Sequence, residues 1–454
     1  MINISIKDVA EYCKGILNDK AEEIAEESIK GASIDTRTIG EGNLFIPFKG
    51  ENVDGHRFIN NAFEKGAGAA LTEEPIENTD ATLPMIHVEN GLEALQMIAE
   101  RYLQLVDPKV IAITGSNGKT TTKDMVECLL ADDYKVRKTI GNYNNEIGLP
   151  LTVLELDRDT EISILEMGMD QTGDINFLSR LAKPDIAIIT NIGESHIEKL
   201  GSREKIAEAK YEIVDGLKDD GVLICSKDYP LLNDLTDAEK NPPFEMHTAG
   251  ISPENDFTIS NISQTESGTE FVMSGFKVEI PQLGTHNAMN AALSLLAVEA
   301  LGKNMEKSSG KFKQLKVSSM RMEQSLHESG ALIINDAYNA SPSSMKSAIN
   351  TVGEMDYSKK ILVLGDILEL GGYTETLHKS IGEHIASVDQ DFKLLTYGDH
   401  SNLISEEAGV ENSMHFSDLK ELSGHLKGML DNETVVLLKG SRGMEMERVN
   451  GYIR

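Results

Sequence analysis

The chain of 454 residues has only three cysteines, Cys13, Cys128 and Cys225. They are far apart and form no C-x-x-C pair, so we expect neither a disulfide framework nor a zinc site. The chain also lacks an apolar segment behind its first residues and any apolar run of about 18 residues, so we expect no signal peptide and no membrane span. Together these absences predict a protein of the reducing cytoplasm.

Positive charge is scarce as well. Lys and Arg number 43 against 74 Asp and Glu, a formal net charge of −31. Such a composition excludes a broad basic surface for nucleic acid or for an anionic membrane. Anionic ligands are not excluded, but they need local cations, helix N-termini or Mg²⁺.

The alternation of elements predicts an α/β fold in three segments, in line with roughly 150 residues per domain. Residues 1–82 read as a small α/β domain. Residues 83–315 alternate apolar strands with amphipathic helices, typical of a P-loop ATPase-type, mostly parallel sheet, with hairpins at 256–280. Residues 316–454 predict a second doubly wound, Rossmann-like sheet, and ligands bind beyond the carboxyl ends of such strands. The expected strands are Leu44–Phe48, Ala69–Thr72, Met85–Val88, Val110–Thr114, Ile162–Glu166, Ile186–Thr190, Val222–Cys225, Leu332–Asn335, Ile361–Gly365, Leu394–Tyr397 and Val435–Leu438.

A Gly-rich turn between a buried strand and a helix is the strongest local signal. Residues 111–121 read I-A-I-T-G-S-N-G-K-T-T. The N–H groups of such a turn and the helix N-terminus bind phosphate, while Lys119 reaches the β- and γ-phosphates and Thr120 binds Mg²⁺. The general P-loop has a glycine where Ile113 stands, so the alternative is a plain turn with a solvated lysine. No N-K-x-D motif occurs, which favours ATP over GTP. The predicted ATP contacts here are Gly115, Ser116, Asn117, Gly118, Lys119, Thr120 and Thr121.

Two side chains at the ends of neighbouring strands are candidate metal ligands. Glu166 ends one strand and His196 follows the next. A carboxylate beside a nucleotide suits Mg²⁺ or a water bound to it. The alternatives are a solvated loop carboxylate and a structural histidine, although the pair is more telling than either residue alone.

Lys210 is unusual because it lies on the buried flank of a helix predicted at 202–217. Burial disfavours the ammonium form of lysine. A neutral amine that takes up CO₂ becomes a carbamate, an oxygen ligand for a second cation. The alternative, which the sequence alone favours, is a lysine whose head group reaches water.

Pairs of asparagines mark two further segments. Asn144 and Asn145 can read a phosphate or a carboxylate, or they serve only the turn chemistry of their loop. Asn287 and Asn290 share a face at the start of a helix predicted at 286–300, where they contact a ligand or cap the helix.

Arg321 and Asp336 lie near the start of the third segment, and Asp336 directly follows a predicted strand. Arg321 could place a second positive charge on a transferring phosphoryl group. Either residue could equally belong to a surface ion pair.

In this order the motifs resemble the Mur ligase family of peptidoglycan synthesis, over nearly the whole chain. The variant loop T-G-S-N-G-K-T-T is normal in that family, so the missing glycine is no departure. The third segment is similar to the branch that attaches D-alanyl-D-alanine. The motifs that carry the resemblance are D-T-R (35–37), G-N-L-F (42–45), D-G-H (54–56), T-G-S-N-G-K-T-T (114–121), E-M-G (166–168), A-K (209–210), H-N-A-M-N (286–290), S-M-R-M-E (319–323), N-D-A-Y-N-A-S-P (335–342), G-D-I-L-E-L-G (365–371) and K-G-S-R (439–442).

The resemblance implies a cytoplasmic, monomeric, ATP-dependent amide ligase. ATP would phosphorylate the terminal carboxylate of UDP-N-acetylmuramoyl-tripeptide, and the amine of D-alanyl-D-alanine would then displace phosphate. By this resemblance, the UDP substrate is bound by Asp35, Thr36, Arg37, Asn144 and Asn145, and D-alanyl-D-alanine by Asn339, Ser441 and Arg442. ATP is bound by the phosphate loop together with Asn287, Asn290, Arg321 and Asp336, and two Mg²⁺ ions are held by Thr120, Glu166, His196 and a carbamylated Lys210. The implied catalytic residues are Lys119, Lys210, His196 and Arg321.

Two other interpretations remain open. A related ligase, MurE or a folylpolyglutamate synthase, would use another acceptor and amine, although the D-N-P-R motif usual in MurE is absent here. A non-catalytic nucleotide switch would hydrolyse ATP slowly, without stimulation by the dipeptide.

Overall fold

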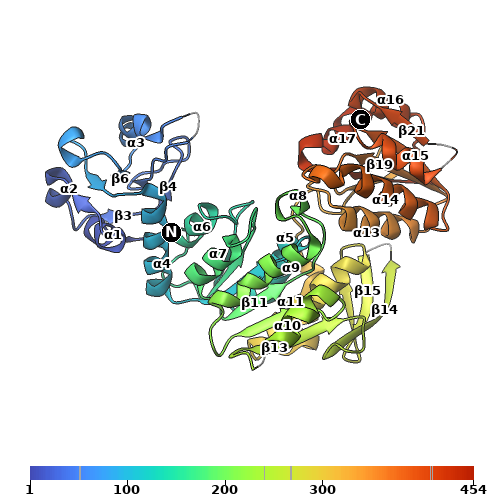
Figure 1. Ribbon diagram of the computed structural model, residues 1–454, viewed down its shortest axis with the longest axis horizontal. Coiled ribbons are helices and arrows are strands. Elements are labelled where there is room, and N and C mark those ends of the chain that lie inside the picture. Colours follow the sequence, from blue (N-terminus) through green and yellow to red (C-terminus); the bar gives the residue numbers. More distant parts are fainter. Residues whose placement is uncertain (51–52, 240, 266–267, 410, 412) are drawn as a thin grey trace.

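The computed structural model describes residues 1–50, 53–239, 241–265, 268–409, 411 and 413–454. Three α/β lobes follow one another along the chain, and Figure 1 shows them as a blue, a green-to-yellow and an orange-to-red body. Each lobe is built on its own sheet, of five, nine and six strands respectively. The expected α/β fold with three successive sheets is confirmed.

The first lobe holds a five-stranded sheet in the order β2-β7-β6-β5-β4, in which β4 to β7 are parallel. Ser5 caps the first helix through a capping box with Asp8, as its position predicts. The elements are β1 (Ile4–Ser5), α1 (Ile6–Cys13), β2 (Ile16–Leu17), α2 (Asp19–Glu23), β3 (Ser28–Ile29), β4 (Ala32–Ser33), β5 (Leu44–Phe45), α3 (Ile59–Glu64), β6 (Ala69–Thr72) and β7 (Met85–His87).

One expected strand pairs elsewhere than predicted. The sequence analysis assigned Met85–Val88 to the second segment, but β7 pairs with β6 and β2 of the first sheet. Its apolar residues show that it is a buried strand, but they do not tell which neighbours it pairs with. The helix that follows, α4 (Gly91–Val106), then leads to the second lobe.

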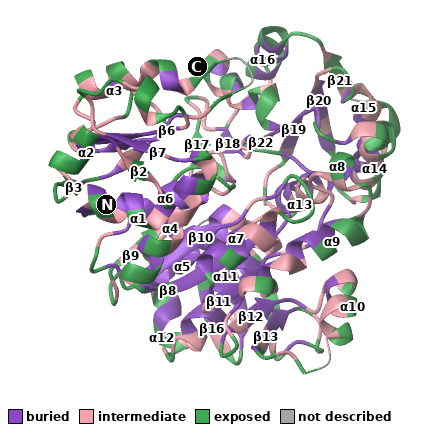
Figure 2. Ribbon diagram, turned by 60° about the vertical axis from the view of Figure 1, so that its left-hand side comes forward, coloured by how far each residue is buried: buried purple, intermediate pink, exposed green. Residues whose placement is uncertain are grey.

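The second lobe is a nine-stranded sheet in the order β16-β15-β14-β13-β12-β11-β8-β10-β9. Strands β8 to β13 are parallel, and the hairpins predicted at 256–280 are the antiparallel β14 to β16. Figure 2 shows β8, β10, β11 and α11 as the buried centre of this lobe. The strands are β8 (Lys109–Thr114), β9 (Val136–Lys138), β10 (Ile162–Glu166), β11 (Ile186–Ile189), β12 (Val222–Cys225), β13 (Glu245–Gly250), β14 (Phe257–Thr265), β15 (Gly268–Met273) and β16 (Phe276–Ile280).

Helices cover both faces of this sheet. The helix predicted at 202–217 is α9 only to Tyr211 and then tightens into a 3₁₀ turn, Glu212–Gly216. A Cβ atom at Gly216 would lie 2.1 Å from the Ser179 carbonyl oxygen, so the chain passes close to its neighbour there. The helices are α5 (Lys119–Leu130), α6 (Gly148–Leu154), α7 (Asp174–Ala182), α8 (Ile197–Leu200), α9 (Arg203–Tyr211), α10 (Pro230–Ala238), α11 (Thr285–Ala300) and α12 (Met305–Ser309).

The third lobe is a six-stranded sheet in the order β17-β18-β22-β19-β20-β21, parallel except for β17. Its buried strands are those predicted, whereas the edge strands β17 and β21 were missed because each has only four residues, of which one in β17 and two in β21 are apolar. The elements are β17 (Glu323–Leu326), β18 (Leu332–Asn335), α13 (Pro342–Gly353), β19 (Lys359–Gly365), α14 (Thr374–Ser387), β20 (Phe392–Tyr397), α15 (Asn402–Ala408), β21 (Ser413–Phe416), α16 (Leu419–Lys427), β22 (Thr434–Lys439) and α17 (Val449–Ile453).

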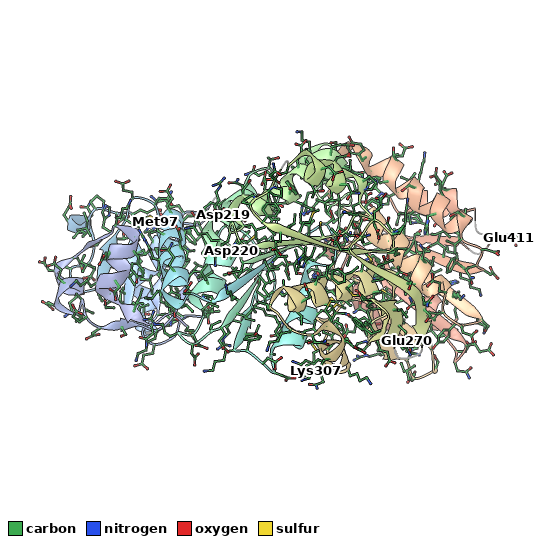
Figure 3. All side chains as sticks on the ribbon, turned by 90° about the horizontal axis from the view of Figure 1, so that it is seen from below. Met97, Asp219, Asp220, Glu270, Lys307 and Glu411 are labelled. Atoms are coloured by element: carbon green, nitrogen blue, oxygen red, sulfur yellow. The ribbon has the colours of Figure 1, made fainter. Side chains whose placement is uncertain are left out.

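Acidic side chains project from the outside of the lobes, as Asp219, Asp220 and Glu411 do in Figure 3. This distribution agrees with the net charge of −31. None of the helices among the described residues combines the length and the apolar character that crossing a bilayer requires.

The apolar centre of the second sheet yields a stability prediction. Ile188 of β11 is fully buried, so Ile188→Ala should lower the free energy of unfolding by about 3 kcal/mol, since it removes packed atoms and leaves a cavity. Ile251→Ala, at a residue that is 52% exposed, serves as the control and should change it by less than about 0.5 kcal/mol. Urea denaturation measures both, and equal losses would contradict the assigned core.

Candidate functional site

A cleft of about 1140 Å³ lies where the carboxyl ends of β8, β10 and β11 face the third lobe. This is the edge at which ligands bind to parallel sheets. Most of the predicted site residues line the cleft: Ser116, Asn117, Gly118, Lys119, Thr120, Thr121, Asn144, Asn145, Glu166, His196, Asn287, Asn290, Arg321, Asp336 and Asn339.

The phosphate loop between β8 and α5 requires its two glycines. Gly115 has φ +146°, and a Cβ there would lie 1.8 Å from the Thr190 hydroxyl oxygen. Gly118 has φ +83°, and a Cβ there would lie 2.5 Å from Asn290 Oδ1. Both values are in the region that favours glycine, so side chains at these positions would distort the loop.

The segment after β11 fixes the loop. Asn117 N–H donates to Asn191 Oδ1 at 2.9 Å, and Gly193 N–H donates to Ser116 Oγ at 2.8 Å. Lys119 Nζ donates to the Gly115 carbonyl at 2.8 Å and so folds back over the loop. Burial lowers the pKa of Lys119, whereas Glu166 opposes this shift. The loop therefore presents a pre-shaped anion site under a single lysine.

Glu166 ends β10 at the floor of the cleft and gathers polar groups around a buried carboxylate. Its Oε2 accepts a hydrogen bond from Thr120 Oγ1 at 3.0 Å and lies 3.3 Å from Lys123 Nζ. Its Oε1 accepts from Asn144 Nδ2 at 2.9 Å. Burial opposes ionisation, but the charges of Lys123 and Lys119 outweigh it and lower the pKa of Glu166. Glu166 is thus an ionised carboxylate beside the phosphate loop.

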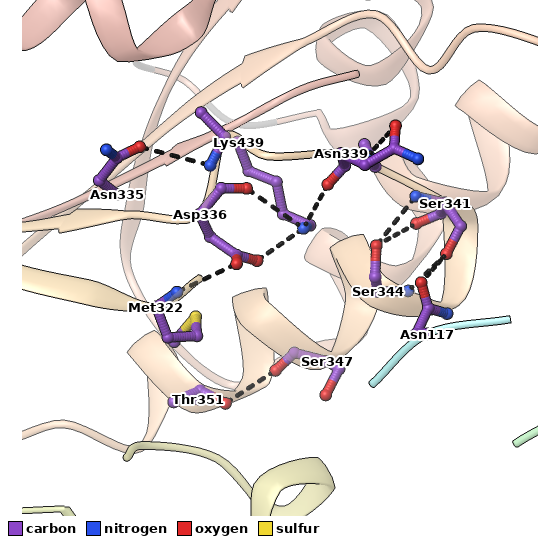
Figure 4. A network of polar contacts seen from close by, with 12 residues as sticks. Asn117, Met322, Asn335, Asp336, Asn339, Ser341, Ser344, Ser347, Thr351 and Lys439 are labelled. Carbon is purple, nitrogen blue, oxygen red and sulfur yellow. Dashed lines mark hydrogen bonds and ion pairs between the residues drawn. The ribbon is translucent and has the colours of Figure 1, made fainter. Parts of the chain in front are cut away.

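The third lobe delivers Arg321 to this group. Arg321 Nη2 donates to Thr120 Oγ1 at 2.9 Å, and its guanidinium lies 4.1 Å from the centre of the Tyr338 ring. Asp336 does not point freely into the cleft, because Oδ2 pairs with Lys439 Nζ at 2.6 Å (Figure 4). Lys439 also donates to the Asn339 carbonyl at 3.1 Å, which ties the two cleft-lining loops together.

The N-terminus of α13 contacts the phosphate loop directly. Asn117 Oδ1 accepts from Ser341 Oγ at 3.1 Å, and Asn117 Nδ2 donates to Ser343 Oγ at 3.2 Å. Figure 4 shows Asn117 on a segment of the chain separate from the one that carries Ser341. The loop is therefore in contact with the third lobe as well as with its own sheet.

His196 lines the cleft, and Lys210 is buried near it. His196 has φ +65°, its Nδ1 lies 3.5 Å from the carboxylates of Asp170 and Glu369, and it makes no hydrogen bond within the described chain. Burial and the charges of Lys119 and Lys210 lower the pKa of His196 to about 4, which leaves a neutral imidazole.

Lys210 is buried, with 2% of its surface exposed, so its head group does not extend into water as the sequence alone favoured. Burial, reinforced by Lys119, brings the pKa of Lys210 well below its ordinary value. Among the described residues, neither a hydrogen bond nor an opposite charge counteracts this lowering of its pKa. Lys210 lies beside the cleft-lining groups but is not itself part of the lining.

Of the five residues expected to bind the UDP substrate, Asn144 and Asn145 line this cleft, whereas Asp35, Thr36 and Arg37 follow β4 in the first lobe, outside it. Asp35 and Arg37 form an exposed ion pair at 2.6 Å, and the Thr36 carbonyl accepts a hydrogen bond from Lys65 Nζ at 2.8 Å. They lie at the carboxyl end of a parallel strand, the ligand-binding side of that sheet.

Of the three residues expected to bind D-alanyl-D-alanine, Ser441 and Arg442 are not part of the cleft lining. Ser441 Oγ accepts from the Leu368 N–H at 2.8 Å and is buried. Arg442 Nη1 pairs with Glu447 at 2.8 Å. Only Asn339 lines the cleft.

Three residues that contact the site, Lys123, Lys439 and Ser343, are not among the site residues predicted from the sequence. Lys123 is four residues after Lys119 and therefore one helical turn further along the same face, which was an available signal. Lys439 ends β22 within the K-G-S-R motif, but its pairing with Asp336 depends on strands far apart in the sequence.

The donor groups fit a hard divalent cation. No group of three or more His, Cys, Asp or Glu that could hold a metal gathers among the described residues. The oxygens of Thr120 and Glu166 nevertheless meet at the phosphate loop, and the His196 Nδ1 atom is buried without a hydrogen bond. Such sites are completed by substrate phosphates.

The fold and the site define a three-lobed α/β protein with a P-loop-type nucleotide site closed by an arginine from its last lobe. Three family models match consecutive parts of the chain: the Mur ligase family, catalytic domain (residues 28–103), the Mur ligase middle domain (113–298) and the Mur ligase, glutamate ligase domain (320–442). The chain belongs to the Mur ligase family.

Individual relatives agree over the full length. The UDP-N-acetylmuramoyl-tripeptide–D-alanyl-D-alanine ligase of Bacillus subtilis is 45% identical over 99% of this chain and 98% of its own. A crystal structure of MurF from Acinetobacter baumannii superposes with a TM-score of 0.90 at 27% identity, covering 99% of both chains. MurF ligase from Thermotoga maritima, solved in complex with ADP, gives 0.84 at 28% identity, covering 94% of this chain and 97% of that one.

The buried pair of Glu166 and Lys123 yields a prediction. Glu166→Gln should lower the free energy of unfolding by about 3 kcal/mol, because it leaves a buried charge unpaired. The double variant with Lys123→Met should recover most of that loss. Because the pKa of Glu166 is lowered on folding, its ionised form stabilises the fold above the unfolded pKa of about 4.3, and this stabilisation is lost as the pH falls through the folded value. Denaturant titrations measure the free energy of unfolding of the wild type, of both single variants and of the double variant. If the losses of the two single variants simply added up in the double variant, the predicted pairing would be contradicted.

Proposed function

We propose that this chain is an ATP-dependent ligase that adds D-alanyl-D-alanine to UDP-N-acetylmuramoyl-tripeptide. The observation that carries the proposal is the convergence of Lys119, Thr120 and Arg321 from two lobes on one cleft, with Arg321 2.9 Å from the Thr120 hydroxyl. The names of the full-length relatives and the ADP complex of one of them support the substrates and the nucleotide.

The site suits a reaction between two negatively charged partners. A substrate carboxylate oxygen attacks the γ-phosphorus of ATP, ADP leaves, and an acyl phosphate forms. The free amine of the dipeptide then attacks the acyl carbon, the amide bond forms, phosphate leaves, and the amine releases a proton. Lys119 and Arg321 offset the repulsion between carboxylate and triphosphate in the first step. Contact of the third lobe with the loop keeps water from the acyl phosphate.

Two Mg²⁺ ions belong to this proposal. Thr120 and Glu166 would hold one, and His196 with a carbamylated Lys210 would hold the other. Such ions supply positive charge to the phosphate oxygens. The neutral imidazole of His196 and the lowered pKa of Lys210 both suit that role.

The remaining assignments follow from the family. Asp35, Thr36, Arg37, Asn144 and Asn145 would bind the UDP substrate, and Asn339, Ser441 and Arg442 the dipeptide; Asn287, Asn290 and Asp336 would contact ATP. Domains of residues 1–82, 83–315 and 316–454 would act together in a cytoplasmic monomer. The pairing of β7 with β6 supports moving the first boundary just beyond His87.

Phosphate release tests the function. The wild-type chain should release phosphate and form the pentapeptide product only when ATP, UDP-N-acetylmuramoyl-tripeptide and D-alanyl-D-alanine are all present, because phosphate leaves when the amine of the dipeptide attacks the acyl phosphate. Lys119→Ala should lower kcat by about 10³-fold, because a charge on the transferring phosphoryl group is lost. Lys307→Ala, at an exposed lysine of α12, is the matched control.

Substrate exchange separates the alternatives. A MurE-type reaction is tested by replacing both substrates. Free amino acids take the place of D-alanyl-D-alanine, and UDP-N-acetylmuramoyl-dipeptide takes the place of the tripeptide substrate. Slow ATP hydrolysis that the dipeptide does not stimulate would overturn the ligase proposal in favour of a nucleotide switch.

The carbamate on Lys210 is tested without turnover. Protein equilibrated with ¹³C-bicarbonate should show a carbamate carbon resonance that Lys210→Met abolishes. Lys360→Met is the matched control, since Lys360 is also buried but donates to the Gly353 carbonyl at 2.6 Å. A signal that survives in Lys210→Met, or is absent from the wild type, would remove the carbamate from the proposal.

A further inference from the structure

A buried carboxylate that the reaction does not use lies one turn beyond the phosphate loop. Asp124 of α5 has 3% of its surface exposed and lies outside the lining of the cleft. Its Oδ2 accepts two hydrogen bonds from one residue, from Ser318 Oγ at 2.6 Å and from Ser318 N–H at 3.1 Å. Its Oδ1 pairs with Lys138 Nζ at 2.6 Å.

Ser318 belongs to the connection between the second and third lobes. This connection runs from the 3₁₀ turn that ends at Gln314 to β17, and Arg321 lies within it, three residues after Ser318. Met320 and Met322, on either side of Arg321, have φ of +59° and +51°. Left-handed backbone at two methionines persists only where the surroundings hold it. The segment that carries Arg321 is therefore held in one conformation.

Helix α5 contacts this connection at two residues, Ser318 and Arg321. Thr120 and Asp124 are four residues apart on α5 and share a face. Thr120 accepts from Arg321, and Asp124 accepts from Ser318. A hydrogen bond to a buried carboxylate is stronger than one between two neutral groups, because the acceptor is charged.

Several other contacts between these two lobes lie away from the connection. Ser347 with the His286 ring, at 2.7 Å, and Tyr373 OH with the Gly201 carbonyl, at 2.7 Å, join parts of the lobes far along the chain from the connection. These two are neutral hydrogen bonds, whereas the Ser343 N–H donates to the Glu194 carboxylate at 3.3 Å, again far along the chain from the connection. The bond between Asp124 and Ser318 lies at the connection itself.

We propose that Asp124 is a positioning residue, which holds Ser318 so that Arg321 reaches the phosphate loop. The inference rests on the proposed function for its kinetic effect. It predicts that Asp124 acts through Arg321 and not through the phosphate loop alone.

Kinetics test this route. Asp124→Asn and Ser318→Ala should each lower kcat about 10- to 100-fold in the phosphate-release assay, with little change in KM for ATP, because Arg321 is displaced from the transferring group. In an Arg321→Ala background the same substitutions should have almost no further effect. Additive losses in the double variants would overturn the proposal, since a purely structural role of Asp124 would not depend on Arg321.

Glu127→Gln is the matched control. Glu127 is the other acid of α5 that pairs with Lys138, at 2.6 Å, but it does not contact Ser318 in the described structure. It should leave kcat unchanged. If Glu127→Gln and Asp124→Asn had equal effects, the cause would be the charge of Lys138, and the proposed role of Asp124 would be wrong.

Hydrogen exchange provides a readout that needs no activity. The amide of Ser318 should exchange faster in Asp124→Asn than in the wild type or Glu127→Gln, measured by mass spectrometry on peptides that span residues 316–322. Unchanged exchange would overturn the proposal even in an active enzyme. If the wild type formed no peptide product but exchange rose as expected, the proposed function would fail and the contact would stand. Ser318→Ala, which keeps the Asp124–Lys138 pair, covers the case in which Asp124→Asn does not fold.

Discussion

The ionised carboxylate of Glu166 is the group on which the site depends. An acidic protein that binds a triphosphate must place cations together, and like charges at short range repel one another. Lys119, Lys123 and Arg321 all act on Glu166, and each of them lowers its pKa. The carboxylate in turn offsets the burial of Lys119. One buried negative charge thus allows three positive groups to gather beside the phosphate loop before any substrate enters.

The parallel sheet explains why these groups meet. The carboxyl ends of β8, β10 and β11 lie side by side, so the phosphate loop, Glu166 and the segment 190–196 reach the same edge although up to 80 residues separate them. On helix α5, Lys119 and Thr120 lie at the cleft. Lys123 and Asp124 lie one turn further along the same face of the helix. The third lobe completes the arrangement with a single arginine.

The sequence predicted what depends on neighbours along the chain. The phosphate loop could be found because strand, glycines and Lys-Thr follow one another along the chain. The partners of β7, the pairing of Asp336 with Lys439 and the burial of Lys210 depend on contacts between distant segments, which a pattern of apolar residues does not encode. The edge strands β17 and β21 were missed because four residues with one or two apolar side chains form too short a pattern to be recognised as a strand.

The route by which the third lobe meets the nucleotide site has a physical consequence. Arg321 is attached to its lobe through β17 and to the second lobe through Ser318, so its position is fixed on both sides. An arginine on a long unanchored loop would lose conformational freedom each time it met a phosphate, at a cost that weakens its effect. Here that ordering is already present, because Asp124, Thr120 and the Tyr338 ring hold the segment and the guanidinium. The proposed reaction, which passes through a hydrolysable acyl phosphate, would gain from such order, since the charges would be in place when the intermediate forms.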